Sequence, residues 1–76
     1  MKRKEYIESN KSIMGGKPVI VGTRIPVSRL LYLLSQGYTF GEVQEEYPQL
    51  TVKTIAGVVG TIAEKADQDI YYQPAP

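Results

Sequence analysis

Residues 15–27 read GGKPVIVGTRIPV, a segment that combines three glycines and two prolines with a run of β-branched residues. Glycine adopts backbone angles that other residues resist, and proline fixes φ and removes a hydrogen-bond donor. Val19, Ile20 and Val21 predict a short buried strand between these turn residues. We therefore expect the chain to enter its helices through an extended, tightly turned segment in which Gly22 has a positive φ.

The dipeptide Gly16-Lys17 superficially resembles a phosphate-binding loop, but its surroundings argue against a nucleotide site. Such a loop leads from Gly-Lys-Ser/Thr directly into a helix whose free amides face the phosphate. Here Pro18 and a strand pattern follow Lys17. The serines also have no histidine to activate them, and no base lies near a nucleophile in the predicted arrangement. We expect no catalytic residue and no small-molecule substrate.

Length and composition narrow the class of protein further. A chain of 76 residues makes one domain, and a domain this small buries only about 60% of its unfolded surface, so we expect a homodimer. The absence of Cys and His argues against disulfides and zinc sites, and we expect no metal and no cofactor. No apolar run approaches the ~20 residues of a membrane span, so a soluble, cytoplasmic protein is expected.

Charge is distributed unevenly along the chain although the net charge is only +1. Residues 1–29 contain seven Lys or Arg against two Glu, an excess of +5. Residues 30–76 contain two Lys against six Asp or Glu, an excess of −4. This separation could present a basic face to nucleic acid, or bring the basic arm of one chain to the acidic helices of another. It could also be solvated surface without a partner.

The spacing of apolar residues predicts a first helix over residues 27–36. One face of this helix carries Val27, Leu30, Leu31 and Leu34. Tyr32 and Leu33 widen that face, so we expect the helix to be buried on two sides. Gly37 suits the left-handed position that ends a helix.

Two further helices follow. Thr39 and Glu42 form a Thr-x-x-Glu capping box at the start of the second helix, and Pro48 ends it after about two turns. Thr51 is the expected cap of the third helix. The apolar face of the third helix carries Val52, Ile55, Val59, Ile62 and Ala66, with Val58 and Ala63 extending it.

Two glycines inside the third helix need an explanation, because each costs roughly 0.5–1 kcal/mol relative to alanine. Gly57 and Gly60 form a flat surface together with Ala56 and Ala63. Another backbone could approach this surface closely, whether from a neighbouring helix, a second subunit or DNA. Alternatively, the glycines merely relieve crowding inside the domain.

A short helix, a tight turn and a longer capped helix are typical of a helix-turn-helix unit. The predicted fold is therefore mainly α, with a three-helix, homeodomain-like or winged-helix-like core and a small N-terminal β element. The candidate DNA-binding residues are Lys17, Arg29, Lys53, Thr54 and Thr61. The third helix offers no Arg or Asn for bidentate base contacts, and three-helix units also serve as protein-binding modules without DNA.

Arg24 has two candidate roles: pairing with Glu45 or Glu46 inside the fold, which we favour, or contacting phosphate.

The chain divides into three parts by composition. Residues 1–12 form a basic arm with a candidate edge strand, residues 13–66 form the helix-turn-helix domain, and residues 67–76 form a tail. In the tail, Ile70, Tyr71 and Tyr72 are candidate partner-binding residues, because amphipathic tyrosines are frequent at interfaces. They could dock on their own domain, on another subunit or in the groove of a partner.

The ordered motifs resemble the domain-of-unknown-function family 433. They are GKPVI-x-GTRIPV at residues 16–27, a leucine-rich helix, Gly-Tyr-Thr at 37–39, Glu-Tyr-Pro at 46–48 and Leu-Thr at 50–51. The resemblance covers about residues 7–66. It implies a homeodomain-like or winged-helix-like fold with an N-terminal β element. It also implies the antitoxin-like half of a toxin–antitoxin pair, which binds operator DNA and a PIN-like ribonuclease toxin.

Overall fold

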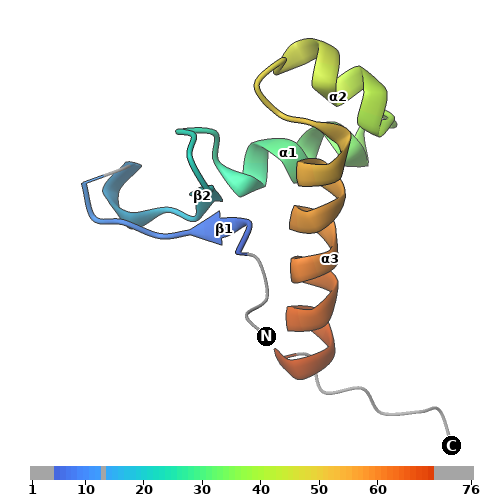
Figure 1. Ribbon diagram of the computed structural model, residues 1–76. Helices are drawn as coiled ribbons and strands as arrows, with labels where there is room; N and C mark the ends of the chain where they lie inside the picture. The colour runs from blue at the N-terminus through green and yellow to red at the C-terminus, as the bar shows by residue number, and fades with distance from the viewer. Residues whose placement is uncertain (1–4, 13, 70–76) are drawn as a thin grey trace, which may run out of the picture.

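The computed structural model describes residues 5–12 and 14–69, and this part of the chain is mainly helical with a small N-terminal sheet (Figure 1). The elements in chain order are β1 (Ile7–Glu8), the short 3-10 helix η1 (Met14–Gly16), β2 (Val19–Ile20), α1 (Val27–Ser35), α2 (Phe40–Glu46) and α3 (Val52–Asp69). The predicted fold class is confirmed.

The buried strand predicted at residues 19–21 forms over Val19–Ile20 only, because Val21 already belongs to the turn and is 41% exposed. β1 and β2 pair antiparallel, with Ile7 opposite Ile20 and Glu8 opposite Val19. The amide of Val21 extends the pairing by donating to the carbonyl of Tyr6 over 2.9 Å. This edge of β2 is therefore satisfied within the chain. Pairing of this edge therefore gives no reason to expect a homodimer.

The other edge of β2 is satisfied by the segment that follows it. The amide of Ile20 donates to the carbonyl of Ile25 over 2.9 Å, and the amide of Val27 donates to the carbonyl of Pro18 over 3.0 Å. The chain reverses between these bonds at Gly22, whose φ of 79° lies in the left-handed region. The positive φ predicted for Gly22 is confirmed, because this tight reversal requires it.

α1 ends as predicted but buries a different set of residues. Gly37 has a φ of 94°, and the amide of Tyr38 donates back to the carbonyl of Leu33 over 3.2 Å, which is the Schellman arrangement. The buried residues of α1 are Val27, Leu30 and Leu33. Leu31 and Tyr32 are 39% and 54% exposed, so the expected burial on two sides is wrong. In the described chain, β2, α2 and α3 pack against one side of α1 only.

α2 is held at its start by the predicted capping box. The amide of Glu42 donates to the Thr39 hydroxyl over 3.1 Å, and the amide of Thr39 donates to the Glu42 carboxylate over 2.8 Å. Val43 is fully buried, and Phe40 and Tyr47 pack against the core from either side. Tyr47 is the C-cap, so the helix ends before Pro48 as predicted.

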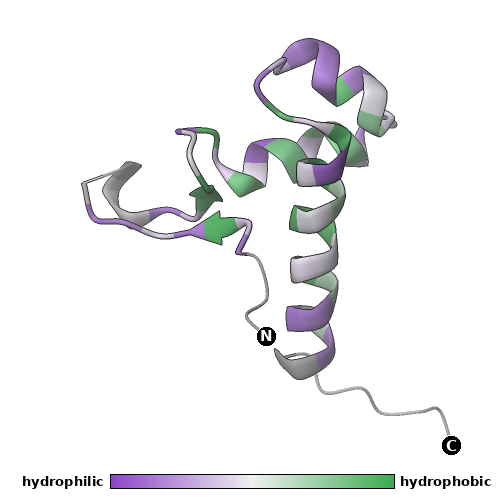
Figure 2. Cartoon of the chain, in the orientation of Figure 1, coloured by the Kyte–Doolittle hydropathy of each residue, from purple (hydrophilic) through white to green (hydrophobic). Residues whose placement is uncertain are grey.

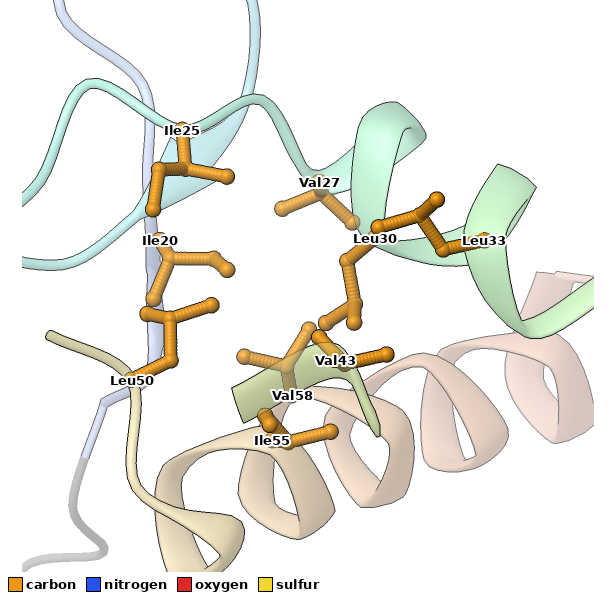
Figure 3. Packing of buried hydrophobic residues seen from close by; sticks show 9 residues of the cluster. All are labelled: Ile20, Ile25, Val27, Leu30, Leu33, Val43, Leu50, Ile55 and Val58. Carbon is orange, nitrogen blue, oxygen red and sulfur yellow. The ribbon is translucent and has the colours of Figure 1, made fainter. Parts of the chain in front are cut away.

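One hydrophobic core joins the β element to all three helices (Figure 3). Its buried members are Ile20, Ile25, Val27, Leu30, Leu33, Val43, Leu50, Ile55 and Val58. In α3 the core lies on Ile55 and Val58, whereas Val52, expected on the buried face, is 43% exposed. α3 then continues past the core, and the side of it seen in Figure 2 is neutral to hydrophilic.

Tyr6 explains one of the two glycines in α3. A Cβ added to Gly57 would collide with the distal atoms of the Tyr6 ring, so the ring lies directly on the bare helix backbone. Gly60 has open space where its Cβ would be. The chain segment before β1 is therefore fixed to α3 by an aromatic ring that only glycine admits at position 57.

Gly57→Ala and Gly60→Ala form a matched pair that tests this contact. Gly60→Ala should raise the free energy of unfolding by roughly 0.5–1 kcal/mol, because alanine is the better helix former. Gly57→Ala should be less stable than Gly60→Ala by about 1–3 kcal/mol, because its methyl group displaces the ring. Denaturant unfolding measures both. In a Tyr6→Ala background the two variants should become equivalent, and equal stabilisation in the wild-type background would contradict the contact.

Candidate nucleic-acid interface

The helix-turn-helix unit consists of α2, the turn over residues 47–51 and α3. The amide of Leu50 donates to the carbonyl of Tyr47 over 2.8 Å, and Leu50 is buried, so the turn is tied to the core. The hydroxyl of Thr51 accepts from the amide of Thr54 over 3.1 Å. Thr51 is therefore the cap of α3, as predicted.

Arg29 reaches this turn from α1. Its Nε donates to the Tyr47 hydroxyl over 3.2 Å, and its guanidinium lies 5.8 Å from the centre of the Tyr32 ring. The hydrogen bond to Tyr47 raises the pKa of Arg29, because it favours the charged form. The side chain is exposed, and its two terminal nitrogens have no hydrogen-bond partner among the described residues. Arg29 thus presents an oriented, open pair of donors beside the turn.

The two candidate lysines lie in different parts of the fold. Lys53 is exposed in the first turn of α3, shortly after the turn that Arg29 contacts. Lys17 precedes β2. Together with Pro18 it lines a hollow whose other side is formed by Val27, Ser28 and Leu31 of α1. The structure therefore associates Arg29 and Lys53 with the helix-turn-helix unit and Lys17 with the outer side of α1.

The two candidate threonines use their hydroxyls inside α3. Thr61 donates to the carbonyl of Gly57 over 2.8 Å, and Thr54 accepts from the hydroxyl of Thr51 over 3.0 Å. Both side chains are half-buried. The exposed side of α3 instead carries Ala56, Gly60 and Ala63, which have no polar group to offer a base. Charged side chains of both signs follow towards the C-terminal end of the helix, at Glu64, Lys65 and Asp67.

The favoured role of Arg24 is not supported by the structure. Arg24 is exposed, and no carboxylate of the described residues, Glu45 and Glu46 included, forms an ion pair with it. Its neighbour Thr23 does the structural work of the turn. The Thr23 hydroxyl donates to the carbonyl of Ile20 over 2.7 Å and accepts from the amide of Ile25 over 3.0 Å.

Sequence reasoning missed the hollow on the outer side of α1. Its volume is about 340 Å³, and it is lined by Lys17, Pro18, Val27, Ser28 and Leu31. The excess of apolar residues in α1 is the sequence feature that indicates this hollow, although it was the basis for expecting the helix to be buried on two sides. Leu31 and Tyr32 instead leave an apolar surface open to solvent.

Some predicted site residues lie outside the described part of the chain. They are the basic arm residues Lys2, Arg3 and Lys4 and the tail residues Ile70, Tyr71 and Tyr72. Within residues 5–12 and 14–69, no group of three or more metal-ligating side chains could hold a metal ion. None of the helices in the same ranges has the length and hydropathy needed to cross a membrane.

Comparisons with known proteins show the family. Residues 7–59 match the family described as "Protein of unknown function (DUF433)". A crystal structure of a DUF433 member protein from Anabaena variabilis ATCC 29413 is similar, with a TM-score of 0.70 and 28% sequence identity. The similarity covers 83% of this chain and 62% of that one, so this chain spans less than two thirds of its length. No curated protein matches. The chain belongs to the DUF433 family.

The adjacent residues Thr23 and Arg24 give a test of which side chain holds the turn. Arg24→Ala should change the free energy of unfolding by less than about 0.5 kcal/mol, as expected for an exposed residue without a partner. Thr23→Val keeps the shape but removes two hydrogen bonds, and should cost about 1–2 kcal/mol. Denaturant unfolding of both variants shows which of the two side chains stabilises the turn. A larger loss for Arg24→Ala would restore the structural role that sequence reasoning favoured.

Proposed function

We propose that this member of the DUF433 family is a small, non-catalytic DNA-binding protein of the antitoxin type, with a PIN-like ribonuclease as its protein partner. The antitoxin type and the ribonuclease follow from the resemblance described above. DNA binding is supported by one observation in particular, which is the pair of cations at the α2–α3 turn. Arg29 is oriented by Tyr47 on one side of the turn, and Lys53 follows it in α3.

The arrangement of Arg29 suits a phosphate group. Its Nε is occupied by Tyr47, which leaves the two terminal nitrogens for a bidentate contact with phosphate oxygens. A side chain that is already oriented loses less conformational entropy when it binds. Lys53 adds a point charge in the first turn of α3, where the positive end of the helix dipole also favours phosphate.

Base reading by this unit would be limited. The hydroxyls of Thr54 and Thr61 are engaged in α3, and the exposed positions between Lys53 and Glu64 are the small residues Ala56, Gly60 and Ala63. Binding would therefore depend mainly on phosphate contacts, which position a protein but carry no sequence information. The basic arm, with Lys2, Arg3 and Lys4, would supply further contacts of this kind.

A second candidate function is a protein-interaction module with the same fold and no DNA binding. The observation that favours it is the apolar surface on the outer side of α1, where Leu31 and Tyr32 are exposed. Exposed apolar surface of this kind is typical of protein interfaces. The two functions make opposite predictions for a DNA-binding assay.

Gel-shift titration against the upstream DNA of the native operon tests the proposal. Arg29→Gln should weaken binding about tenfold and reduce the salt slope by roughly 1 per protomer, because it removes one phosphate contact. Tyr47→Phe should weaken binding to a smaller degree, because it removes the anchor but keeps the charge. Lys53→Ala should relax any sequence preference if this lysine reaches a base edge.

Lys65→Gln is the matched control, because Lys65 is an exposed cation in the later part of α3, about 18 Å along the helix from Lys53. It should leave both affinity and salt slope unchanged. Equal losses in the Arg29 and Lys65 variants would indicate non-specific attraction. Absence of retardation at low salt, with and without the protein partner, would refute DNA binding and favour the interaction module.

A further inference from the structure

The outer face of α1, which we define by Lys17, Pro18, Ser28, Leu31 and Tyr32, has no role in the core or at the helix-turn-helix unit. Six of the nine residues of α1 are apolar, yet the fold buries one side of the helix only. The hollow beside Leu31 is almost entirely apolar in its lining, and Lys17 is its one charged residue. A ligand for this face would be an apolar or aromatic peptide that carries negative charge.

The chain itself contains such a peptide directly after α3. Ile70, Tyr71 and Tyr72 are three large side chains in succession, and Asp67 and Asp69 precede them in the last turn of the helix. We propose that this segment of one copy docks in the outer face of α1 of a second copy. The acidic residues would then approach Lys17 while the aromatic side chains cover Leu31 and the hollow.

Geometry excludes the same docking within one copy. α1 packs beside the first half of α3, where Val58 contributes to the shared core (Figure 1). From Val58 to Asp69 the helix advances by about 16 Å, at ~1.5 Å per residue. The three residues after Asp69 span at most about 11 Å when fully extended. Their backbone therefore ends short of its own core, and the outer face of α1 lies a further helix diameter away.

Reciprocal exchange gives a closed dimer. Each copy provides one segment and one outer face, so a two-fold axis forms two identical contacts and leaves no open site to extend the assembly. The contact does not use Lys53, and it meets Arg29 only through Tyr32, whose ring lies 5.8 Å from the Arg29 guanidinium. The tests below therefore leave Arg29, Tyr32 and Lys53 unchanged, and they measure dimerisation rather than DNA binding.

Two variants separate the two halves of the contact. Leu31→Glu places a charge on the outer face, and because Leu31 is 39% exposed the monomer should still fold. Deletion of residues 70–76 removes the docking segment and leaves the outer face intact. Light scattering and sedimentation equilibrium should show a wild-type dimer at micromolar concentration. Each variant should dimerise at least tenfold more weakly.

Mixing the two variants provides the decisive measurement. The Leu31→Glu chain still has a docking segment, and the shortened chain still has an outer face, so a heterodimer with one intact contact should form. Val52→Glu is the matched control, because Val52 is similarly exposed, at 43%, but lies on α3. It should leave the dimer unchanged. Ser28→Arg, which fills the hollow from an exposed position, should behave as Leu31→Glu does, and circular dichroism checks that each variant folds.

Several results would overturn the proposal. A wild-type chain that stays monomeric at every concentration would do so, as would variants that dimerise as well as wild type. Loss of the dimer in Val52→Glu alone would place the interface on α3. Monomeric variants that fail to form a heterodimer would show that the segment and the outer face do not meet.

Discussion

The hydrogen bonds on both edges of β2 are the constraint on which the rest of the fold depends. On one edge the bonds reach back to the segment that carries Tyr6, and on the other they reach forward to Ile25 and Val27. This double pairing holds the segment with Tyr6 and β1, the strand β2 and the segment that leads into α1 together. It also places Ile20 in the core and sets the point at which α1 starts. Through Ile20, Ile25 and Val27 this element joins the hydrophobic core that it shares with α1, α2 and α3.

Much of this fold could be predicted because its local signals are strong. The capping box at Thr39, the left-handed Gly37 and the positive φ of Gly22 each follow from the chemistry of neighbouring residues in the sequence. The side of a helix that becomes buried is decided by distant elements. Apolar periodicity therefore found α1 but could not show that Leu31 and Tyr32 would remain exposed. Likewise, nothing near Gly57 in the sequence indicated that Tyr6 would lie on it.

In the candidate interface, too, residue types could be predicted from the sequence, whereas contacts between distant residues could not. Exposed cations could be named from the sequence: Arg29 contacts Tyr47, and Lys53 lies in the first turn of α3. The partner that orients Arg29 could not be named, because Tyr47 is eighteen residues away and is the C-cap of another helix. Thr54 and Thr61 were predicted to contact DNA, but their hydroxyls form hydrogen bonds within the chain instead. A threonine hydroxyl in a helix can bond to the helix itself, which withdraws it from the surface without changing the exposed pattern.

The contact between Tyr6 and Gly57 makes these two positions a size-matched pair. The ring occupies the volume that a side chain at position 57 would need, so Gly57 cannot gain a side chain without displacing the ring while Tyr6 is retained. A smaller residue would have to replace Tyr6 before a residue with a side chain could replace Gly57. Through this pairing a segment at one end of the chain restricts which sequences are acceptable in the middle of α3, more than forty residues away.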